Sequence, residues 1–136
     1  MTDVARRSEL RTEDLLGLRA LSPMEIDQLP WEDVEGYPGV HQKILWRLGD
    51  IVESLVRYEP GTSSPGPAHL AAHHHIWVVS GAATIAGRRL LAGSYAHIPP
   101  GLDHPTTGVG PEGCTLLVMY RPHGPQEEAA LLHQAR

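Results

Sequence analysis

The stretch GSYAHIPPGLDH, residues 93–104, predicts a short strand that ends in a tight turn and is followed by a histidine. The run SYAHI is rich in aromatic and aliphatic residues, as strands are. Pro99, Pro100 and Gly101 favour a turn, because proline restricts φ and glycine adopts conformations that other residues avoid. This turn sets the position of His104 relative to the strand.

Working outward, further short runs alternate with Gly/Pro turn signals, a pattern typical of an antiparallel sandwich or barrel. The expected strands are 41–48, 51–58, 74–80, 82–87, 94–98 and 114–120, with a turn at Ser80-Gly81. Residues 8–21 have near-helical leucine spacing, and 23–29 suit a short helical turn that begins at Pro23. We expect an all-β fold with an N-terminal helical or irregular segment at 1–38, a barrel at 39–122 and a tail at 123–136.

Composition indicates which kinds of partner the protein binds and in which cellular compartment it is found. The chain has 136 residues and a formal net charge of −5, and its basic residues are scattered, which argues against nucleic-acid binding. No apolar run is long enough to span a membrane, and residues 1–16 lack the apolar core of a signal peptide. The single cysteine, Cys114, cannot form an internal disulfide and fits a reducing cytoplasm. We therefore expect a cytoplasmic protein with a small-molecule substrate.

Histidines and carboxylates are distributed in opposite ways along the chain. Of nine histidines, six fall between residues 69 and 104, whereas Asp103 is the only acid between residues 60 and 111. A metal site in this stretch would therefore be rich in imidazole, which suits Zn, Fe, Ni and Cu better than Ca or Mg. His41, His123 and His133 lie outside the stretch, and we expect them to be solvated.

The same stretch resembles a family motif. Residues 93–104 match the second cupin motif, G-x5-P-x-G-x2-H, at each of these defined positions. The frame of the first motif, G-x5-H-x-H-x3,4-E-x6-G, fits from Gly61 to Gly81, with Pro67 at the first histidine position and His74 at the glutamate position. The chain is therefore similar to small single-domain cupins, including the subgroup near the zinc anti-sigma factors. This resemblance implies a double-stranded β-helix, or jelly-roll barrel.

The resemblance implies that His69, His74 and His104 hold one divalent metal ion, Fe²⁺ or Zn²⁺ first, with Ni²⁺ or Mn²⁺ as further options. Residues two apart on a strand share a face, so an inward His74 would turn Ile76 and Val78 inward and His73, His75 and Trp77 outward. A register shift of one residue would reverse this, which leaves His73 and His75 as alternative ligands.

Two other polar side chains lie on expected strands of the barrel. Glu53 is the only acid in the middle of an expected barrel strand, and it is a candidate ligand or general base. His97 lies on the strand before Pro99, where alternation favours a rim or surface position.

Three functions remain open at this point. The first is a metal-dependent enzyme acting on a carbonyl, enolic or phenolic molecule, either a three-histidine Fe(II) dioxygenase or a Lewis-acid cyclase or isomerase. The second is a metal- or ligand-binding sensor without turnover, and the third is a metal-free structural cupin. Cupins of this size usually pair through sheet edges, so we also expect a homodimer.

Overall fold

The computed structural model describes residues 17–68 and 71–122, and these form a mainly antiparallel β-structure with one short helix. The elements are α3 (Pro23–Gln28), β1 (Glu32–Asp33), β2 (Val40–Leu48), β3 (Ile51–Tyr58), β4 (Ala72–Ile85), β5 (Arg88–Leu91), β6 (Tyr95–Ile98), β7 (Thr106–Thr107) and β8 (Cys114–Pro122). The expected all-β fold with a short helix is confirmed. The helical prediction for 8–21 lies largely outside the described residues, and the tail 123–136 lies outside them entirely.

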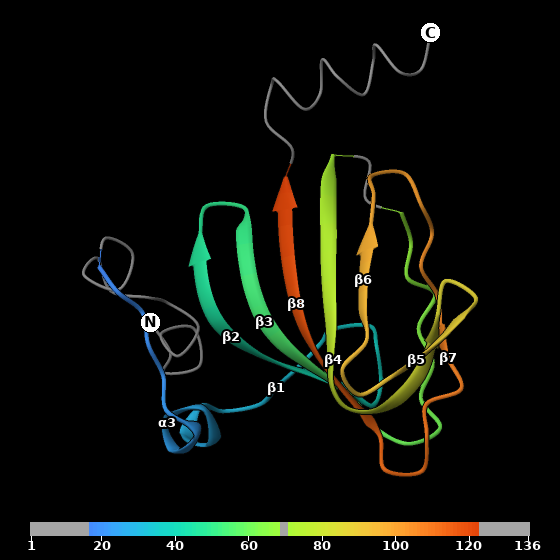
Figure 1. Cartoon of the computed structure of the whole chain (residues 1–136), viewed down its shortest axis with the longest axis horizontal. Coiled ribbons are helices and arrows are strands. Elements are labelled where there is room, and N and C mark those ends of the chain that lie inside the picture. The colour runs from blue at the N-terminus through green and yellow to red at the C-terminus, as the bar shows by residue number, and fades with distance from the viewer. Residues whose placement is uncertain (1–16, 69–70, 123–136) are drawn as a thin grey trace, which may run out of the picture.

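Most strands lie side by side in one curved sheet (Figure 1), in the order β1-β2-β3-β8-β4, with β6 on the far side of β4. The last strand, β8, inserts between β3 and β4 and pairs with both along its length. Strands from the two ends of the described chain are therefore neighbours. This arrangement bends the sheet around an interior space, and the second half of β4 continues into a small sheet with β5 and β7.

The predicted turn at Ser80-Gly81 was wrong, because β4 is one strand of 14 residues that runs through it. Its pairing with β8 shifts by one residue between Val78 and Ser80, and beyond Gly81 its partners become β5 and β7. Gly81 has a φ of +77°, and a Cβ atom there would overlap the carbonyl oxygen of Gly113. Glycine therefore lets β4 bend from one sheet into the other instead of turning back.

The hydrophobic core lies where the two sheets meet. Its buried members are Ile76, Val78, Ala83, Ile85, Ile98, Val109, Cys114 and Leu116. The Cys114 side chain is fully buried, and burial raises the pKa of its thiol, as expected of a structural cysteine. Two members of this core, Ile76 and Leu116, also line a cavity on the inner face of the sheet.

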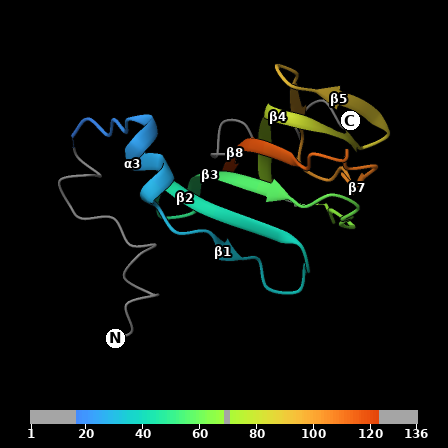
Figure 2. The same cartoon turned by 90° about the horizontal axis from the view of Figure 1, so that it is seen from below.

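The segment before the barrel packs beside β2 (Figure 2). Helix α3 begins at Pro23, and Ser22 and Glu25 form a reciprocal capping box at its N-terminus. The buried Lys43 of β2 donates a hydrogen bond from Nζ to the carbonyl oxygen of Ile26 at 2.9 Å. Within the described residues, no helix is long and apolar enough to cross a membrane.

Candidate functional site

Two of the predicted ligands meet inside the barrel. His74 lies on the inner face of β4, and His104 lies in the loop between β6 and β7. Nδ1 of His74 is 3.3 Å from Nε2 of His104, and the two rings are edge-on with an interplanar angle of 89°. Strand β4 and the loop after β6 thus bring together two imidazole nitrogens from residues that are 30 positions apart in the sequence.

The backbone around His104 holds its ring in this position. The His104 N–H donates to the carbonyl oxygen of Gly66 at 2.7 Å, and Ala68 donates its N–H to the Asp103 carboxylate at 2.9 Å. A Cβ atom at Gly66 would overlap the carbonyl oxygen of His104, so only glycine allows the two loops to cross so closely. The 61–68 loop, which leads to His69, is therefore fastened beside His104.

The second nitrogen of His104 faces a backbone acceptor. Nδ1 lies 3.3 Å from the carbonyl oxygen of Leu102, which can only accept, so the neutral tautomer that makes this hydrogen bond carries its proton on Nδ1. In that tautomer Nε2 has a lone pair and accepts from Nδ1 of His74. Metal-binding histidines in proteins almost always donate their other N–H in this way. The loop therefore presents His104 in the tautomer that metal binding needs.

The spacing of the two nitrogens fits a shared metal ion. The two nitrogens lie within hydrogen-bond distance of each other, at 3.3 Å, and two ligands bound at about 2.0–2.1 Å to one tetrahedral zinc ion would stand about 3.3–3.4 Å apart. Within residues 17–68 and 71–122, no group of three or more histidine, cysteine or carboxylate side chains is arranged to hold a metal ion. His69, the third predicted ligand, lies outside those residues.

His73 and His75, the alternatives left open by the sequence, point to the opposite face of β4, which we call the outer face. His73 Nδ1 lies 2.8 Å from Nε2 of His97, and the three rings stack with interplanar angles of 17–18°. The rings of His73, His75 and His97 are therefore stacked nearly parallel, whereas those of His74 and His104 meet edge-on. The structure does not bring His73 or His75 to His104.

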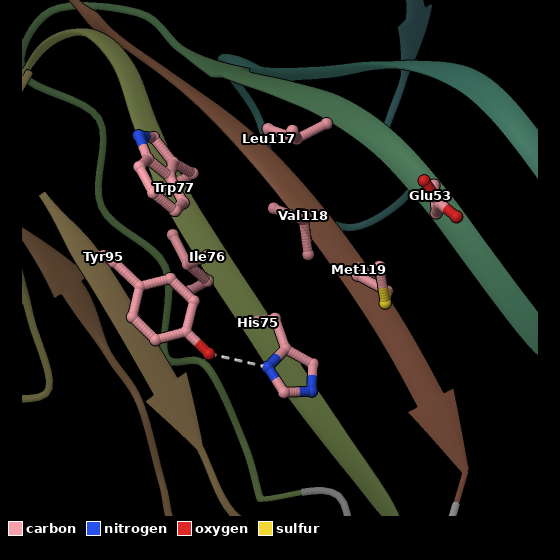
Figure 3. Close-up of a pocket in the computed structure, with 8 residues that line it drawn as sticks. All are labelled: Glu53, His75, Ile76, Trp77, Tyr95, Leu117, Val118 and Met119. Carbon is pink, nitrogen blue, oxygen red and sulfur yellow. Dashed lines mark hydrogen bonds between the residues drawn. The ribbon is translucent and has the colours of Figure 1, made fainter. Parts of the chain in front are cut away.

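Glu53 does not lie near His74 and His104 either, because its side chain is on the outer face of the sheet. Figure 3 shows its carboxylate beside Met119 on an open groove whose other side is formed by Trp77 and Tyr95. His75 Nδ1 contacts the Tyr95 hydroxyl there at 2.8 Å. Along β3 the inner positions belong to Val52, Ser54 and Val56, so alternation turns Glu53 away from the predicted ligands.

A cavity of about 430 Å³ surrounds the two histidines, which is within the range of small-molecule sites. Its walls combine aliphatic side chains with a few polar ones, among them Gln42, Arg47, Ser54, Tyr58, His74, His104 and Tyr120. The Tyr120 ring lies 5.2 Å from that of His74. Aspartate and glutamate are missing from the lining residues, all of which belong to the described part of the chain.

Arg47 is a charged lining residue that the sequence did not predict. Strict alternation from Gln42 and Ile44 would place Trp46 inside, but the pairing of β2 with β3 shifts between Ile44 and Trp46. This bulge inserts one residue and brings Arg47, the partner of Val52, to the inner face. No residue pattern within β2 predicts the bulge, so only the structure shows it.

The fold agrees with the comparisons to known proteins. The family model described as the ChrR cupin-like domain matches residues 21–124, so the chain belongs to the cupin superfamily and to that family within it. KdgF from Halomonas sp. is similar over 74% of this chain and 94% of its own, with 25% identity and a TM-score of 0.61. No curated protein matched the chain.

Two further solved structures are similar in fold. The polyketide cyclase RemF from Streptomyces resistomycificus is 19% identical over 78% of this chain and 82% of its own, with a TM-score of 0.63. An RmlC-like cupin from Shewanella frigidimarina is 24% identical over 74% of this chain and 90% of its own, with a TM-score of 0.58. The predicted resemblance to small cupins is thus confirmed.

Proposed function

We propose that this protein is a metal-dependent cupin enzyme that acts on a small organic molecule inside the barrel. The observation that supports this best is the convergence of His74 Nδ1 and His104 Nε2 at 3.3 Å, on the inner face of a cavity of about 430 Å³. His69 is the proposed third ligand. When bound, a divalent metal ion supplies a Lewis acid that polarises a carbonyl, or, as iron(II), redox chemistry with O₂.

The residues around the histidines have separate roles in this proposal. The Leu102 carbonyl orients the ring of His104, and the Tyr120 ring packs beside that of His74. Ile76, Leu116 and Val118 form an apolar wall of the cavity. A carbonyl, enol or phenol group of the substrate would lie beside the histidines, with its apolar part against this wall.

Metal content tests the proposal directly. Untagged wild-type protein should contain about one Fe, Zn, Ni or Mn per chain by elemental analysis, and His74→Ala and His104→Ala should each lose it, because too few ligands remain. His75→Ala is the matched control: it is the neighbour of His74 but faces outward, so its metal content should stay at the wild-type level. Equal losses in His74→Ala and His75→Ala, or a metal-free wild type, would contradict the proposal.

Turnover separates the enzyme from a sensor that uses the same cavity. The match to the ChrR cupin-like domain supports the sensor as second candidate. Oxygen consumption with diketones, catechols and thiols tests the dioxygenase, and solvent-deuterium exchange next to a carbonyl tests Lewis-acid chemistry. Metal-loaded protein that binds ligands but passes neither test would favour the sensor.

A further inference from the structure

Arg47 is the one permanently charged side chain that lines the cavity around His74 and His104. Among the described residues, none forms an ion pair or a hydrogen bond with its guanidinium group. Its side chain is exposed to solvent. A guanidinium group with five N–H donors and no protein partner is suited to bind an oxyanion in two-pronged fashion.

Strand pairing places Arg47 in line with the proposed metal ligand. Arg47 pairs with Val52, Val52 with Tyr120, and Tyr120 with His74, so the four residues form one row across β2, β3, β8 and β4. Three interstrand spacings separate the ends of this row, which is about 14 Å between backbones. The curvature of the sheet turns both end side chains toward the same cavity.

A second polar group faces the space between them. Ser54 is 6% exposed, lies on the inner face of β3 and lines the cavity. Among the described residues, no hydrogen bond reaches its hydroxyl group. The hydroxyl group faces the cavity, so it can hydrogen-bond a polar atom that is bound there.

We infer that the substrate is a small organic carboxylate. Its carboxylate group pairs with Arg47, a polar atom further along hydrogen-bonds Ser54, and its other end lies beside His74 and His104. Its turnover and its contact beside His74 and His104 rest on the proposed function, whereas its contacts with Arg47 and Ser54 do not. The absence of acidic side chains from the described lining removes the repulsion that an anionic ligand would otherwise meet.

Linear dicarboxylates from succinate to suberate test the inference, because their length probes the span between the two ends. Calorimetric titration of full-length, zinc-loaded protein should show one best member of the series, and its monoamide, lacking one charge, should bind more weakly. Arg47→Gln should weaken the best dicarboxylate about tenfold or more, as expected for loss of a charged hydrogen-bonded pair. Arg47→Lys should fall between the two, since it keeps the charge but not the two-pronged geometry.

Controls separate this inference from the metal proposal. Arg88→Gln, at an exposed position on β5, should bind the dicarboxylate like wild type, and Ser54→Ala should bind it severalfold more weakly. All variants should keep the wild-type zinc content. Unchanged dicarboxylate affinity in Arg47→Gln, or no binding of any member to wild type, would overturn the inference. A protein that takes up no metal yet binds dicarboxylates through Arg47 would instead overturn only the metal proposal.

Discussion

At the scale of single residues, position along β4 decides what each consecutive histidine contacts. His74 meets His104 inside the barrel, whereas His73 and His75 stack with His97 outside. Because side chains alternate between the two faces of a strand, an inward His74 requires that His73 and His75 point outward. Motif spacing from Gly81 had favoured His74 for this inner position, and the structure puts it there.

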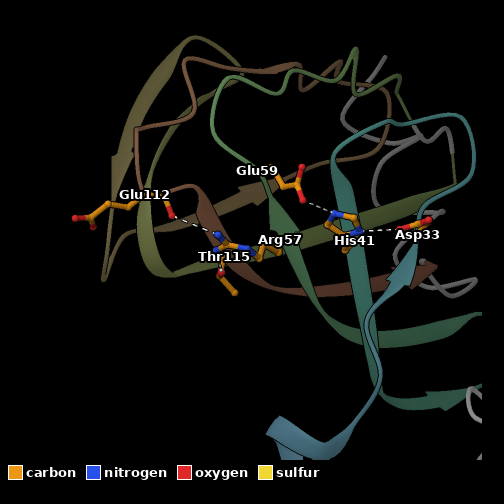
Figure 4. Close-up of polar contacts among 6 residues, drawn as sticks. All are labelled: Asp33, His41, Arg57, Glu59, Glu112 and Thr115. Atoms are coloured by element: carbon orange, nitrogen blue, oxygen red, sulfur yellow. Dashed lines mark hydrogen bonds and ion pairs between the residues drawn. The ribbon is translucent and has the colours of Figure 1, made fainter.

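His41 is partly exposed, and two carboxylates flank its ring (Figure 4). Its Nε2 lies 3.0 Å from Glu59 and its Nδ1 lies 2.8 Å from Asp33. The hydrogen bond to Glu59, followed by that to Asp33, raises the pKa of His41 above its usual value. The contacts join β1 and the 59–62 loop to β2.

This arrangement predicts a pH dependence of stability. A raised pKa in the folded state means that the charged ring stabilises the fold fully below its ordinary pKa, about 6.5, and that this contribution is lost as pH rises through the raised value. The difference in unfolding free energy between wild type and His41→Gln should therefore shrink as the pH rises above about 6.5 in urea titrations. It should not exceed about 1 kcal/mol, since both carboxylates are largely exposed.

The charge-neutral variants identify the partners of His41. By NMR titration, Glu59→Gln should lower the pKa of His41 more than Asp33→Asn does, because Glu59 makes the larger contribution. An unchanged pKa in both variants would contradict this account.

At the scale of elements, irregular positions in β2 and β4 determine the shape of the barrel. The bulge in β2 turns Arg47 inward, and Arg19 donates a hydrogen bond from Nε to the bulge carbonyl of Leu45 at 3.0 Å. The bend in β4 at Gly81 connects the two sheets. Both features depend on contacts with distant segments, which explains why alternation along one strand did not predict them.

Gly81→Ala should test the bend. Its Cβ atom would meet the backbone of Gly113 in addition to the cost of a positive φ, so we expect a loss of about 2–4 kcal/mol in unfolding free energy by chemical denaturation. Gly87→Ala is the matched control, because Gly87 has a φ of +80° with nothing within 4 Å of the added atom. It should lose only about 1–2 kcal/mol. Equal losses in the two variants would show that the close approach at Gly81 does not matter.

At the scale of the whole molecule, the insertion of β8 between β3 and β4 assembles the cavity. It places Tyr120 between Val52 and His74, and it completes the row that ends in Arg47. The N-terminal segment adds to the edge at β2, where the buried Lys43 reaches Ile26 and lies 4.6 Å from the Trp31 ring. Ligands bound in this cavity would therefore contact strands from across the barrel.

Metal binding should stabilise the whole fold. Zinc at one hundred times its dissociation constant is expected to add about 2.7 kcal/mol to the unfolding free energy, or roughly 8–11 °C in Tm. Differential scanning calorimetry with zinc and with a chelator measures this shift. The double variant with His74→Ala and His104→Ala should show no shift, and a shift of the wild-type size in it would place the metal elsewhere.

The homodimer expected from the sequence stays a prediction. In the described chain, β1 covers β2 only at His41 and Gln42, so the edge of the second half of β2 has no strand partner. Exposed edges of this kind favour pairing with another strand. Sedimentation equilibrium should give twice the subunit mass of 14.8 kDa, and a mass of one subunit would contradict the prediction.

The sequence by itself determined the family, the strand-rich fold and the choice of His74 and His104 as residues of the interior. Each of these depends on local spacing: the turn at Pro99–Gly101, the offset between His74 and Gly81, and the two-residue period of strands. Only the tertiary structure decided that β4 is continuous, that Glu53 faces outward and that Arg47 faces the cavity. These outcomes depend on which strands become neighbours and where their registers shift. The residue pattern of a single segment does not predict such long-range strand pairings.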